Sequence, residues 1–404
     1  MSLEKMRVIS LGGCGGMGQF AVRTALSYKF VDEIIIADID GERGQAFAEE
    51  CGSKATFQEI DVQDHSALIK LLSDADMVLT TVGPYYRYGV PILKAAIESG
   101  CHYIDINDDW EPTLEMLELN DEAKRAGITA IIGMGASPGQ SNMLAAKAMS
   151  LVDSVEELIT GWGTGGGRSR EQRDADNSRA GQGGSFGAAV EHWVHQFTGT
   201  IRLFRNGTFV DVKPMEEIKI DYPGIGLCTA YTVGHPEPLT LPHFRSEMKH
   251  SCNVMVVSPS LIKMLQDIAK EVDEGRMTIS EATNVIMNPS RDRERQQPEA
   301  DSAQADAPRL PGLFAYARGL KDGKGKSVGV TVAAGVSGGM GGATGVPMAI
   351  GLKMLASGKI TLHGTFAPEQ VIDPDDFFDE FGPLCTIPEP KTSAKEMLLI
   401  TISS

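Results

Sequence analysis

Residues 7–135 alternate between two kinds of hydrophobic pattern. Short runs rich in β-branched residues predict strands, and longer segments with apolar residues at helical spacing predict helices. The predicted strands cover residues 7–11, 33–38, 55–61, 76–82, 102–107 and 129–134. The predicted helices between them cover residues 16–28, 40–52, 65–75, 89–100 and 115–127. Because the alternation is strict and the strands are almost continuously apolar, we expect an α/β fold with a doubly wound parallel sheet.

The pattern changes after residue 149. Strand-like pieces then follow one another with turn signals between them and without regular helices, which predicts a mainly antiparallel sheet. These pieces cover residues 155–162, 199–204, 216–222 and 251–257. Further along, residues 326–336 predict another strand, and residues 343–358 predict an apolar helix that ends at Gly358. A helix this apolar must be buried, and packing back on the first domain would bury it.

Three segments interrupt this order of strands and helices. Glycines crowd residues 161–170 and 179–188, which fit flexible linkers and ligand-binding loops equally well, because glycine serves both flexibility and close backbone approach. Residues 288–312 are polar, charged and contain prolines, which predicts an exposed loop.

Charge and cysteine content exclude several classes of function. The chain of 404 residues has a formal net charge of -17, which repels nucleic-acid phosphates, so we expect no nucleic-acid partner. The six cysteines form no close pair and indicate neither a metal site nor a disulfide framework. No apolar run approaches the roughly 18 residues of a membrane span. We therefore expect a cytoplasmic protein that acts on a small molecule.

The strongest chemical signal lies in the turn between the first predicted strand and helix. Gly13, Gly15 and Gly18 match the pattern G-x-G-x-x-G, whose glycines permit a tight turn, backbone approach to a pyrophosphate and close packing of helix on strand. Asp38 ends the second strand 20 residues after Gly18, where a carboxylate can accept hydrogen bonds from a ribose. The same carboxylate would repel a 2′-phosphate, which favours NAD, although the nearby Arg43 keeps NADP as a second candidate.

Two further strand ends are expected at the same edge. After the fourth strand, Gly83 and Pro84 predict a backbone corner along the dinucleotide, followed by Tyr85 and Tyr86. These tyrosines would lie beside the nicotinamide and the substrate, or would simply cap the sheet. Within the fifth strand, Asp105 is a carboxylate in a segment otherwise suited to burial, and a buried carboxylate is costly unless it is paired or used.

Other polar residues near the fifth strand have simpler interpretations. His102 fits a structural histidine better than a proton shuttle. Asp108 and Asp109 fit caps of the next helix better than catalytic groups.

A second cluster lies in residues 231–245. His235, Glu237, His243 and Arg245 stand between prolines, which hold a loop extended so that its side chains can face a ligand. Arginine matches the two oxygens of a substrate carboxylate. The alternative is an ordinary edge strand with solvated charges.

Several segments together resemble one family. The stretches VISLGGCGGMGQFAVRTAL, TTVGPYYRYGVPILKAAIESGCHYIDIND, GASPGQSN, GHPEPLTLP and TGVPMAIGLKMLASGKI are similar to the saccharopine dehydrogenase (reductase-type) superfamily, which includes lysine 6-dehydrogenase and carboxynorspermidine dehydrogenase. The resemblance implies a Rossmann domain at residues 1–138, an inserted α+β substrate and dimerisation domain at residues 139–342, and C-terminal helices at residues 343–404 that return to the first domain. It also implies a homodimer.

The resemblance places NAD(P) on the glycine loop and the neighbouring strand ends. The expected cofactor-binding residues are Gly13, Gly15, Gly16, Met17, Gly18, Asp38, Asp61, Val82, Gly83 and Pro84. The implied chemistry is hydride transfer at a carbon that bears an amine, in an amino acid such as lysine or in an amino-acid or polyamine conjugate. We expect Asp105 to be the acid/base, with His243 and His235 as alternatives, and Tyr85, Tyr86, Arg245 and Glu237 to bind substrate.

Two other functions fit the same pattern. A reductase of the same fold would act on an enoyl or lipid substrate and would have a more apolar cleft than His, Glu and Arg side chains provide. A non-catalytic sensor would bind the dinucleotide without transferring hydride to any amine.

Overall fold

The computed structural model describes residues 5–163, 187–288 and 308–403. Contacts divide these residues into two compact units. The first unit contains residues 5–143 and 333–397, and the second contains residues 144–163, 187–332 with its gap, and 398–403. Most of the glycine-rich segments at 161–170 and 179–188 and of the polar segment at 288–312 lies outside the described residues.

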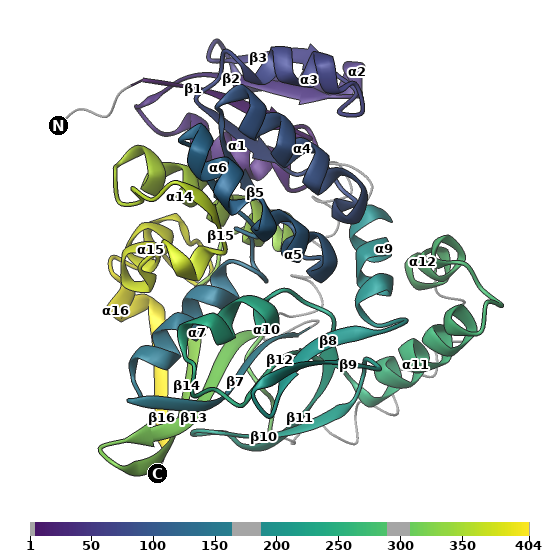
Figure 1. Ribbon diagram of the computed structural model, residues 1–404, viewed down its shortest axis with the longest axis vertical. Helices are drawn as coiled ribbons and strands as arrows, with labels where there is room; N and C mark the ends of the chain where they lie inside the picture. The colour runs from purple at the N-terminus through teal and green to yellow at the C-terminus, as the bar shows by residue number, and fades with distance from the viewer. Residues whose placement is uncertain (1–4, 164–186, 289–307, 404) are drawn as a thin grey trace. The chain divides into compact units, whose positions relative to one another are not determined.

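The first unit is built on a seven-stranded parallel sheet with the order β15-β6-β5-β4-β1-β2-β3 (Figure 1). The strands are β1 (Met6–Leu11), β2 (Val31–Asp38), β3 (Ala55–Glu59), β4 (Met77–Thr80), β5 (His102–Asp105), β6 (Thr129–Ile131) and β15 (Gly364–Phe366). Strand β2 pairs with β1 and β3 pairs with β2, whereas β4 pairs with the other edge of β1. The order therefore reverses between β1 and β4, and the carboxyl ends of these two strands are the expected ligand-binding edge.

Helices connect these strands. They are α1 (Gly18–Leu26), α2 (Gly41–Cys51), α3 (His65–Leu72), α4 (Tyr85–Ser99), α5 (Trp110–Glu118) and α6 (Asn120–Ala126). Leu68 and Leu72 of α3 and Ile92 of α4 join one buried cluster with Ile9 and Val78 of the sheet. The segment predicted as one helix at 115–127 contains parts of two helices, because the chain turns at Leu119 between α5 and α6.

The C-terminal part of the first unit packs directly on the start of α1. Its helices are α14 (Gly339–Ala356), α15 (Pro374–Phe381) and α16 (Ala394–Met397), with single turns of 3-10 helix at Pro368–Gln370 and Gly382–Leu384. A Cβ atom at Gly341 would lie 2.6 Å from the carbonyl oxygen of Gly16. A Cβ atom at Gly345 would overlap the carbonyl oxygen of Met17. Glycine at these two positions thus lets α14 approach the backbone of the loop and of α1.

Helix α7 (Gln140–Ser150) carries the chain from the first unit into the second. The second unit contains a nine-stranded sheet with the path β10-β11-β12-β7-β13-β14-β16, to which β8 and β9 are added beside β12. Among the described strands of this second sheet only β7 and β12 pair in parallel, and the other pairs are antiparallel. The strands are β7 (Ser154–Gly163), β8 (Ile201–Arg205), β9 (Thr208–Val212), β10 (Glu217–Tyr222), β11 (Gly226–Val233), β12 (His250–Val256), β13 (Leu313–Lys321), β14 (Lys324–Val332) and β16 (Leu398–Ser403).

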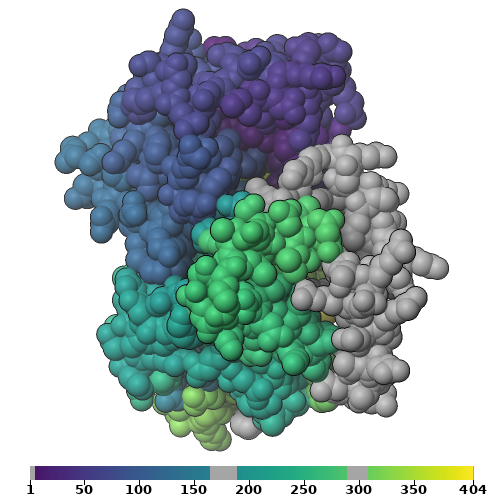
Figure 2. Space-filling view, turned by 90° about the vertical axis from the view of Figure 1, so that its right-hand side faces the viewer, coloured from purple at the N-terminus to yellow at the C-terminus, as the bar shows by residue number. Residues whose placement is uncertain are grey.

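The sheet of the second unit is curled and carries helices on its surface. The ring of Tyr222 on β10 lies against Gly329 of β14 and Phe314 of β13, although β10 and β14 are far apart in the strand order. The helices are α9 (Gly187–Gln196), α10 (Glu237–Thr240), a 3-10 turn at Leu241–Phe244, α11 (Pro259–Asp273) and α12 (Ile279–Met287). Helices α11 and α12 form the green face of the space-filling view (Figure 2).

The expected α/β class is confirmed: a parallel Rossmann-like sheet is accompanied by a second, mixed and mainly antiparallel sheet. The sequence pattern misses the helices α9, α10, α11 and α12 and the strands β9, β11, β13, β15 and β16. Among the described residues, no helix combines the length and apolar character needed to span a membrane.

Candidate functional site

The glycine loop connects the end of β1 to the start of α1 and is held by its own backbone. The N–H of Gly12 donates to the carbonyl of Ala37 on β2 at 2.8 Å, and that of Gly15 donates to the carbonyl of Gly12 at 2.9 Å. Gly12 has a φ of 71°, a left-handed conformation that favours glycine. The loop therefore turns sharply beside the carboxyl end of β2.

The glycines of the fingerprint are required by close packing. A Cβ atom at Gly13 would lie 2.6 Å from Oγ of Ser10, and one at Gly15 would lie 2.9 Å from the carbonyl oxygen of Gly12. One at Gly18 would overlap that same carbonyl oxygen. Only glycine at these positions allows α1 to begin this close to β1.

The amino-terminal end of α1 fits an anionic ligand. Asp40 and Asp64 cap α2 and α3 with their side chains, but among the described residues no side chain caps α1 and its first turn contains no acidic residue. The N–H groups of Gln19 and Phe20 already donate to the carbonyls of Gly15 at 3.0 Å and Met17 at 3.2 Å, so the start of α1 attracts an anion through the positive end of the helix dipole. A dinucleotide phosphate is the acceptor that this strand, loop and helix arrangement binds in other proteins.

Asp38 is the last residue of β2 and lies beside the glycine loop. Its Oδ2 accepts a hydrogen bond from Sγ of Cys14 at 3.0 Å, and its Oδ1 accepts one from the N–H of Asp40 at 3.2 Å. The side chain is half-buried. The structure thus brings together the loop and the carboxylate that the spacing predicts as partners.

The end of β4 meets the same loop. Oγ1 of Thr81 donates to the carbonyl of Gly12 at 2.9 Å, and Val82 packs against the buried cluster of the sheet. Gly83 and Pro84 are joined by a cis peptide bond, and Pro84 directly precedes α4. Asp61 follows β3 as an exposed residue whose Oδ1 accepts from the N–H of Gln63 at 2.9 Å.

The two tyrosines after the corner lie in different surroundings. Tyr85 is buried, and its hydroxyl donates to the carbonyl of Thr80 at 3.0 Å, while burial raises its pKa above the ordinary value. Tyr86 is 49% exposed, and its backbone N–H donates to Oδ2 of Asp109 at 3.2 Å. Of the two, Tyr86 is therefore the one that a ligand can reach.

Asp105 is fully buried at the end of β5 and accepts hydrogen bonds from three donors. Oδ2 accepts from the hydroxyl of Tyr103 at 2.7 Å, and Oδ1 accepts from the N–H groups of Asn107 at 3.0 Å and Gly133 at 2.6 Å. Burial raises the pKa of Asp105 to about 6, against the lowering effect of these bonds. The carboxyl group thus holds together the backbone that follows β5 and the backbone that follows β6.

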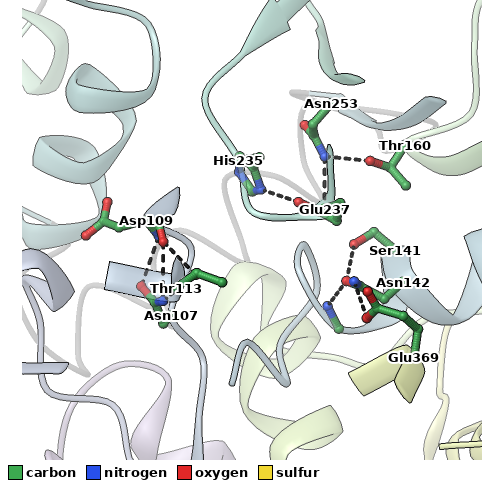
Figure 3. Close-up of polar contacts among 11 residues, drawn as sticks. Asn107, Asp109, Thr113, Ser141, Asn142, Thr160, His235, Glu237, Asn253 and Glu369 are labelled. Atoms are coloured by element: carbon green, nitrogen blue, oxygen red, sulfur yellow. Dashed lines mark hydrogen bonds and ion pairs between the residues drawn. The ribbon is translucent and has the colours of Figure 1, made fainter. Parts of the chain in front are cut away.

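The residues around Asp105 have mainly structural partners. Nδ1 of His102 accepts from the N–H of Thr129 at 2.9 Å, as expected for a structural histidine, and burial lowers its pKa. Asp109 precedes α5, but among the described residues no side chain caps this helix, so the expected capping role is wrong. Nδ2 of Asn107 instead donates to Oγ1 of Thr113 at 2.8 Å, and this hydroxyl donates to the carbonyl of Asp109 at 2.7 Å (Figure 3).

In the second unit, a buried polar chain connects β7, α10 and β12. Nδ1 of His235 lies 3.0 Å from Oε2 of Glu237 (Figure 3). Nδ2 of Asn253 donates to Oε1 of Glu237 at 3.0 Å and to Oγ1 of Thr160 at 2.9 Å. His235 is 2% exposed, and Glu237 and Asn253 are fully buried. A histidine oriented by a carboxylate, which is itself oriented by an amide, is an arrangement suited to proton transfer.

The other two polar residues predicted in this segment lie closer to solvent. The guanidinium of Arg245 donates to the carbonyls of Met149 at 3.1 Å and Asp153 at 3.3 Å. His243 is exposed, and its ring lies 6.3 Å from that of Phe209. The structure thus separates His235 and Glu237, which are paired and buried, from Arg245 and His243.

Sequence reasoning missed Asn253 and Thr160, and also a buried pair in the first unit. Nδ2 of Asn142 on α7 donates to Oε2 of Glu369 at 2.7 Å, and Oδ1 of Asn142 accepts from the N–H of Gly139 at 2.8 Å (Figure 3). The available signal was a single polar residue within an apolar run, as in SCNVMVV around Asn253.

The parallel sheet, the glycine loop and Asp38 together define a Rossmann-like dinucleotide-binding domain. Residues 8–131 match the family described as Saccharopine dehydrogenase NADP binding domain. The chain thus contains a saccharopine dehydrogenase-type NAD(P)-binding domain and is similar to saccharopine dehydrogenase-like oxidoreductases.

Similarity to other proteins extends beyond this domain. A carboxyaminopropylagmatine dehydrogenase from Synechocystis sp. is 24% identical over 93% of this chain and 96% of its own length. A saccharopine dehydrogenase [NADP(+), L-glutamate-forming] from Saccharomyces cerevisiae is 34% identical over 27% of this chain and 23% of its own length. The solved structure of an apo saccharopine dehydrogenase (L-Glu forming) from S. cerevisiae covers 99% of this chain and 100% of that one, with a TM-score of 0.65 and 18% identity, and so shares the fold.

Proposed function

We propose that this protein is an NAD-dependent dehydrogenase that oxidises the amine-bearing carbon of an amino acid or of an amino-acid or polyamine conjugate. The observation that carries the proposal is the buried pair of His235 and Glu237, in a chain whose other unit has a dinucleotide loop. The similarity to carboxyaminopropylagmatine dehydrogenase along nearly the whole chain supports it, because that name describes a dehydrogenase of a conjugated amine.

The cofactor part of the proposal rests on the first unit. The uncapped end of α1 and the loop Gly13, Gly15, Gly16, Met17 and Gly18 would hold the pyrophosphate, and Asp38 would hold the adenosine ribose. Residues at the ends of β3 and β4 would line the rest of the dinucleotide: Asp61, Val82, Gly83 and Pro84. A carboxylate at the ribose favours NAD over NADP. A bound nicotinamide supplies the hydride acceptor.

His235 and Glu237 would handle the proton of the reaction. Oxidation of a secondary amine removes a hydride from carbon and a proton from nitrogen, and water then adds to the imine to release an amine and a carbonyl compound. Glu237 holds Nδ1 of His235 and so fixes the tautomer of the ring that would carry the proton. Asn253 fixes Glu237 and thereby the orientation of the imidazole.

The other expected site residues take secondary places in this proposal. Asp105 accepts three protein hydrogen bonds and is fully buried, which favours a positioning role at the strand ends over contact with substrate. The guanidinium of Arg245 donates to two backbone carbonyls, so a substrate carboxylate would use its remaining N–H groups. Tyr86 remains the tyrosine placed to contact a ligand, and His243 is the rival base.

A second candidate is a reductase of an enoyl or lipid substrate. It is favoured by similarity to a trans-acting enoyl reductase from Mycobacterium tuberculosis, which is 26% identical over 37% of this chain and 38% of its own length. The buried ionisable pair of His235 and Glu237 argues for the amine substrate, because an apolar substrate gives such a pair no partner.

The experiment is to follow NADH formation with a panel of amines, using NAD and NADP in parallel. The panel contains lysine, saccharopine, other opine-like conjugates and carboxylated polyamines, with enoyl thioesters tested in the reductive direction. Growth of NADH absorbance with at least one amine supports the proposal. Turnover of an enoyl substrate alone selects the second candidate, and dinucleotide binding without any hydride transfer indicates a sensor.

We also propose that the protein is a cytoplasmic homodimer. In the described part of the chain β16 pairs only with β14, and it exposes Leu399 and Ile402 by 51% and 54%. An uncharged edge strand with exposed apolar side chains suits pairing with a second copy. Analytical ultracentrifugation of the full chain tests this part, and a monomer at micromolar concentration contradicts it.

A further inference from the structure

The variable residue between the first two glycines of the fingerprint is a cysteine that touches Asp38. Sγ of Cys14 lies 3.0 Å from Oδ2 of Asp38, and Cys14 is 1% exposed. The G-x-G-x-x-G pattern allows any residue at this position. The contact therefore links a residue outside the motif to the carboxylate proposed to hold the ribose.

The thiol acts as the donor in this contact. Burial, and then the hydrogen bond to Asp38, raise the pKa of Cys14 to about 12, so the sulfur keeps its proton at neutral pH. Ionised Asp38 can only accept hydrogen bonds. The direction of the bond is thus fixed, and the buried thiol is also a poor nucleophile.

A second donor holds the other oxygen of the same carboxylate. The N–H of Asp40 donates to Oδ1 of Asp38 at 3.2 Å. With Oδ2 held by Cys14 and Oδ1 held by Asp40, the plane of the carboxylate is fixed before any ligand binds. Each carboxylate oxygen has a second lone-pair direction, so both can still accept a ribose hydroxyl.

We propose that Cys14 is a positioning residue that holds Asp38 ready for the ribose hydroxyls and thereby sets the preference for NAD over NADP. This inference rests on the proposed function, in which Asp38 binds the adenosine ribose. A carboxylate fixed in advance loses less conformational freedom when NAD binds, which raises affinity. The affinity for NADP does not rise in the same way, because its 2′-phosphate is repelled by the carboxylate in any orientation.

The test compares Cys14→Ala with Cys14→Ser in the full-length protein. Alanine removes the donor, whereas serine keeps a donor of similar size. We expect Cys14→Ala to raise the Kd for NAD, measured by isothermal titration calorimetry, by about fivefold, as for loss of one ordinary hydrogen bond. The Kd for NADP should change less than about twofold, and Cys14→Ser should restore the affinity for NAD.

Other outcomes overturn the inference in distinguishable ways. Equal weakening of NAD and NADP by Cys14→Ala, with a lower Tm and no rescue by serine, shows that Cys14 only packs the loop. Asp38→Asn is the control for the underlying function. If Asp38→Asn weakens NAD binding and Cys14→Ala does not, only the role of Cys14 is wrong; if Asp38→Asn has no effect, the ribose assignment fails as well.

Discussion

Nδ1 of His235 lies 3.0 Å from Oε2 of Glu237, and the two side chains are 2% and 0% exposed. Burial of ionisable groups is costly unless they are paired and hydrogen-bonded, and here Asn253 supplies the additional bond to Glu237. Within the second unit, Asn253 also donates to Thr160 and so connects the pair to β7. Its tautomer is set by the carboxylate, which is the arrangement that a histidine needs to transfer a proton repeatedly.

Replacing either member of this pair should reduce turnover without affecting the cofactor. His235→Asn removes the proton carrier, and Glu237→Gln removes the carboxylate that orients it, so we expect kcat to fall by about 10²- to 10⁴-fold in each. The Kd for NAD should stay unchanged, because the dinucleotide loop belongs to the other unit. Steady-state kinetics on the best amine and calorimetric titration with NAD measure the two quantities.

A second histidine–glutamate pair provides the matched control. Nε2 of His65 lies 3.2 Å from Oε2 of Glu98, but these side chains are 50% and 53% exposed. His65→Asn should leave kcat unchanged. Loss of turnover in His243→Asn with normal turnover in His235→Asn would instead make His243 the base.

The sequence predicts the fold of the first unit well because β1, β2, β4 and β5 are largely apolar runs between amphipathic helices. The ends of the strands are less well predicted. The strand predicted at 76–82 ends at Thr80 and the one predicted at 102–107 ends at Asp105, because the chain leaves the ladder to form the loops of the candidate site. Strand β16 was missed although its sequence, LLITIS, is itself an apolar run with β-branched residues.

The sequence also predicts some contacts of the candidate site and not others. The contact between the glycine loop and Asp38 is predictable because both follow from one strand–helix–strand unit. The contacts of Glu237 with Asn253 and of Asn142 with Glu369 are not, since they join separate segments and leave only isolated polar residues as a signal. Burial also separates Tyr85 from Tyr86, a difference that two adjacent tyrosines in a sequence do not reveal.

The hydroxyl of Thr81 should contribute to cofactor affinity through the glycine loop. It donates to the carbonyl of Gly12 at 2.9 Å and connects the end of β4 to the loop. Thr81→Val keeps the shape and removes the donor, so we expect the Kd for NAD to rise by about three- to tenfold. The control is Thr56→Val, whose hydroxyl makes only an exposed contact of 3.4 Å with Glu33. Equal Kd values for the two variants would contradict this role.

Gly345 should be needed for both stability and cofactor binding, although it lies far from the fingerprint in the sequence. A Cβ atom there would overlap the carbonyl oxygen of Met17 at the start of α1. We expect Gly345→Ala to lower the free energy of unfolding by about 1–3 kcal/mol and to weaken NAD binding by displacing α1. Gly335→Ala is the matched control, because no described atom lies within 4 Å of its added Cβ. Similar losses in both variants would mean that the contact with Met17 is unimportant.

The buried carboxyl of Asp105 should make the stability of the protein depend on pH. Its pKa is raised by burial from the ordinary 3.8 to about 6, so folding favours the protonated form. Its contribution to stability is therefore fully present below about pH 4 and is lost as the pH rises through about 6, by up to about 3 kcal/mol. Asp105→Asn cannot ionise, so its deficit relative to the natural protein should be largest near pH 4 and shrink towards pH 7.

Urea unfolding of both proteins between pH 4 and pH 7 measures this deficit directly. A constant deficit would mean that folding does not shift the pKa of Asp105. A deficit that grows with pH would mean that the bonds from Tyr103, Asn107 and Gly133 outweigh burial, because these donors favour the ionised carboxylate. Tyr103→Phe separates the two effects: removing one donor should raise the pKa of Asp105 further and move the pH-dependent loss of stability to higher pH.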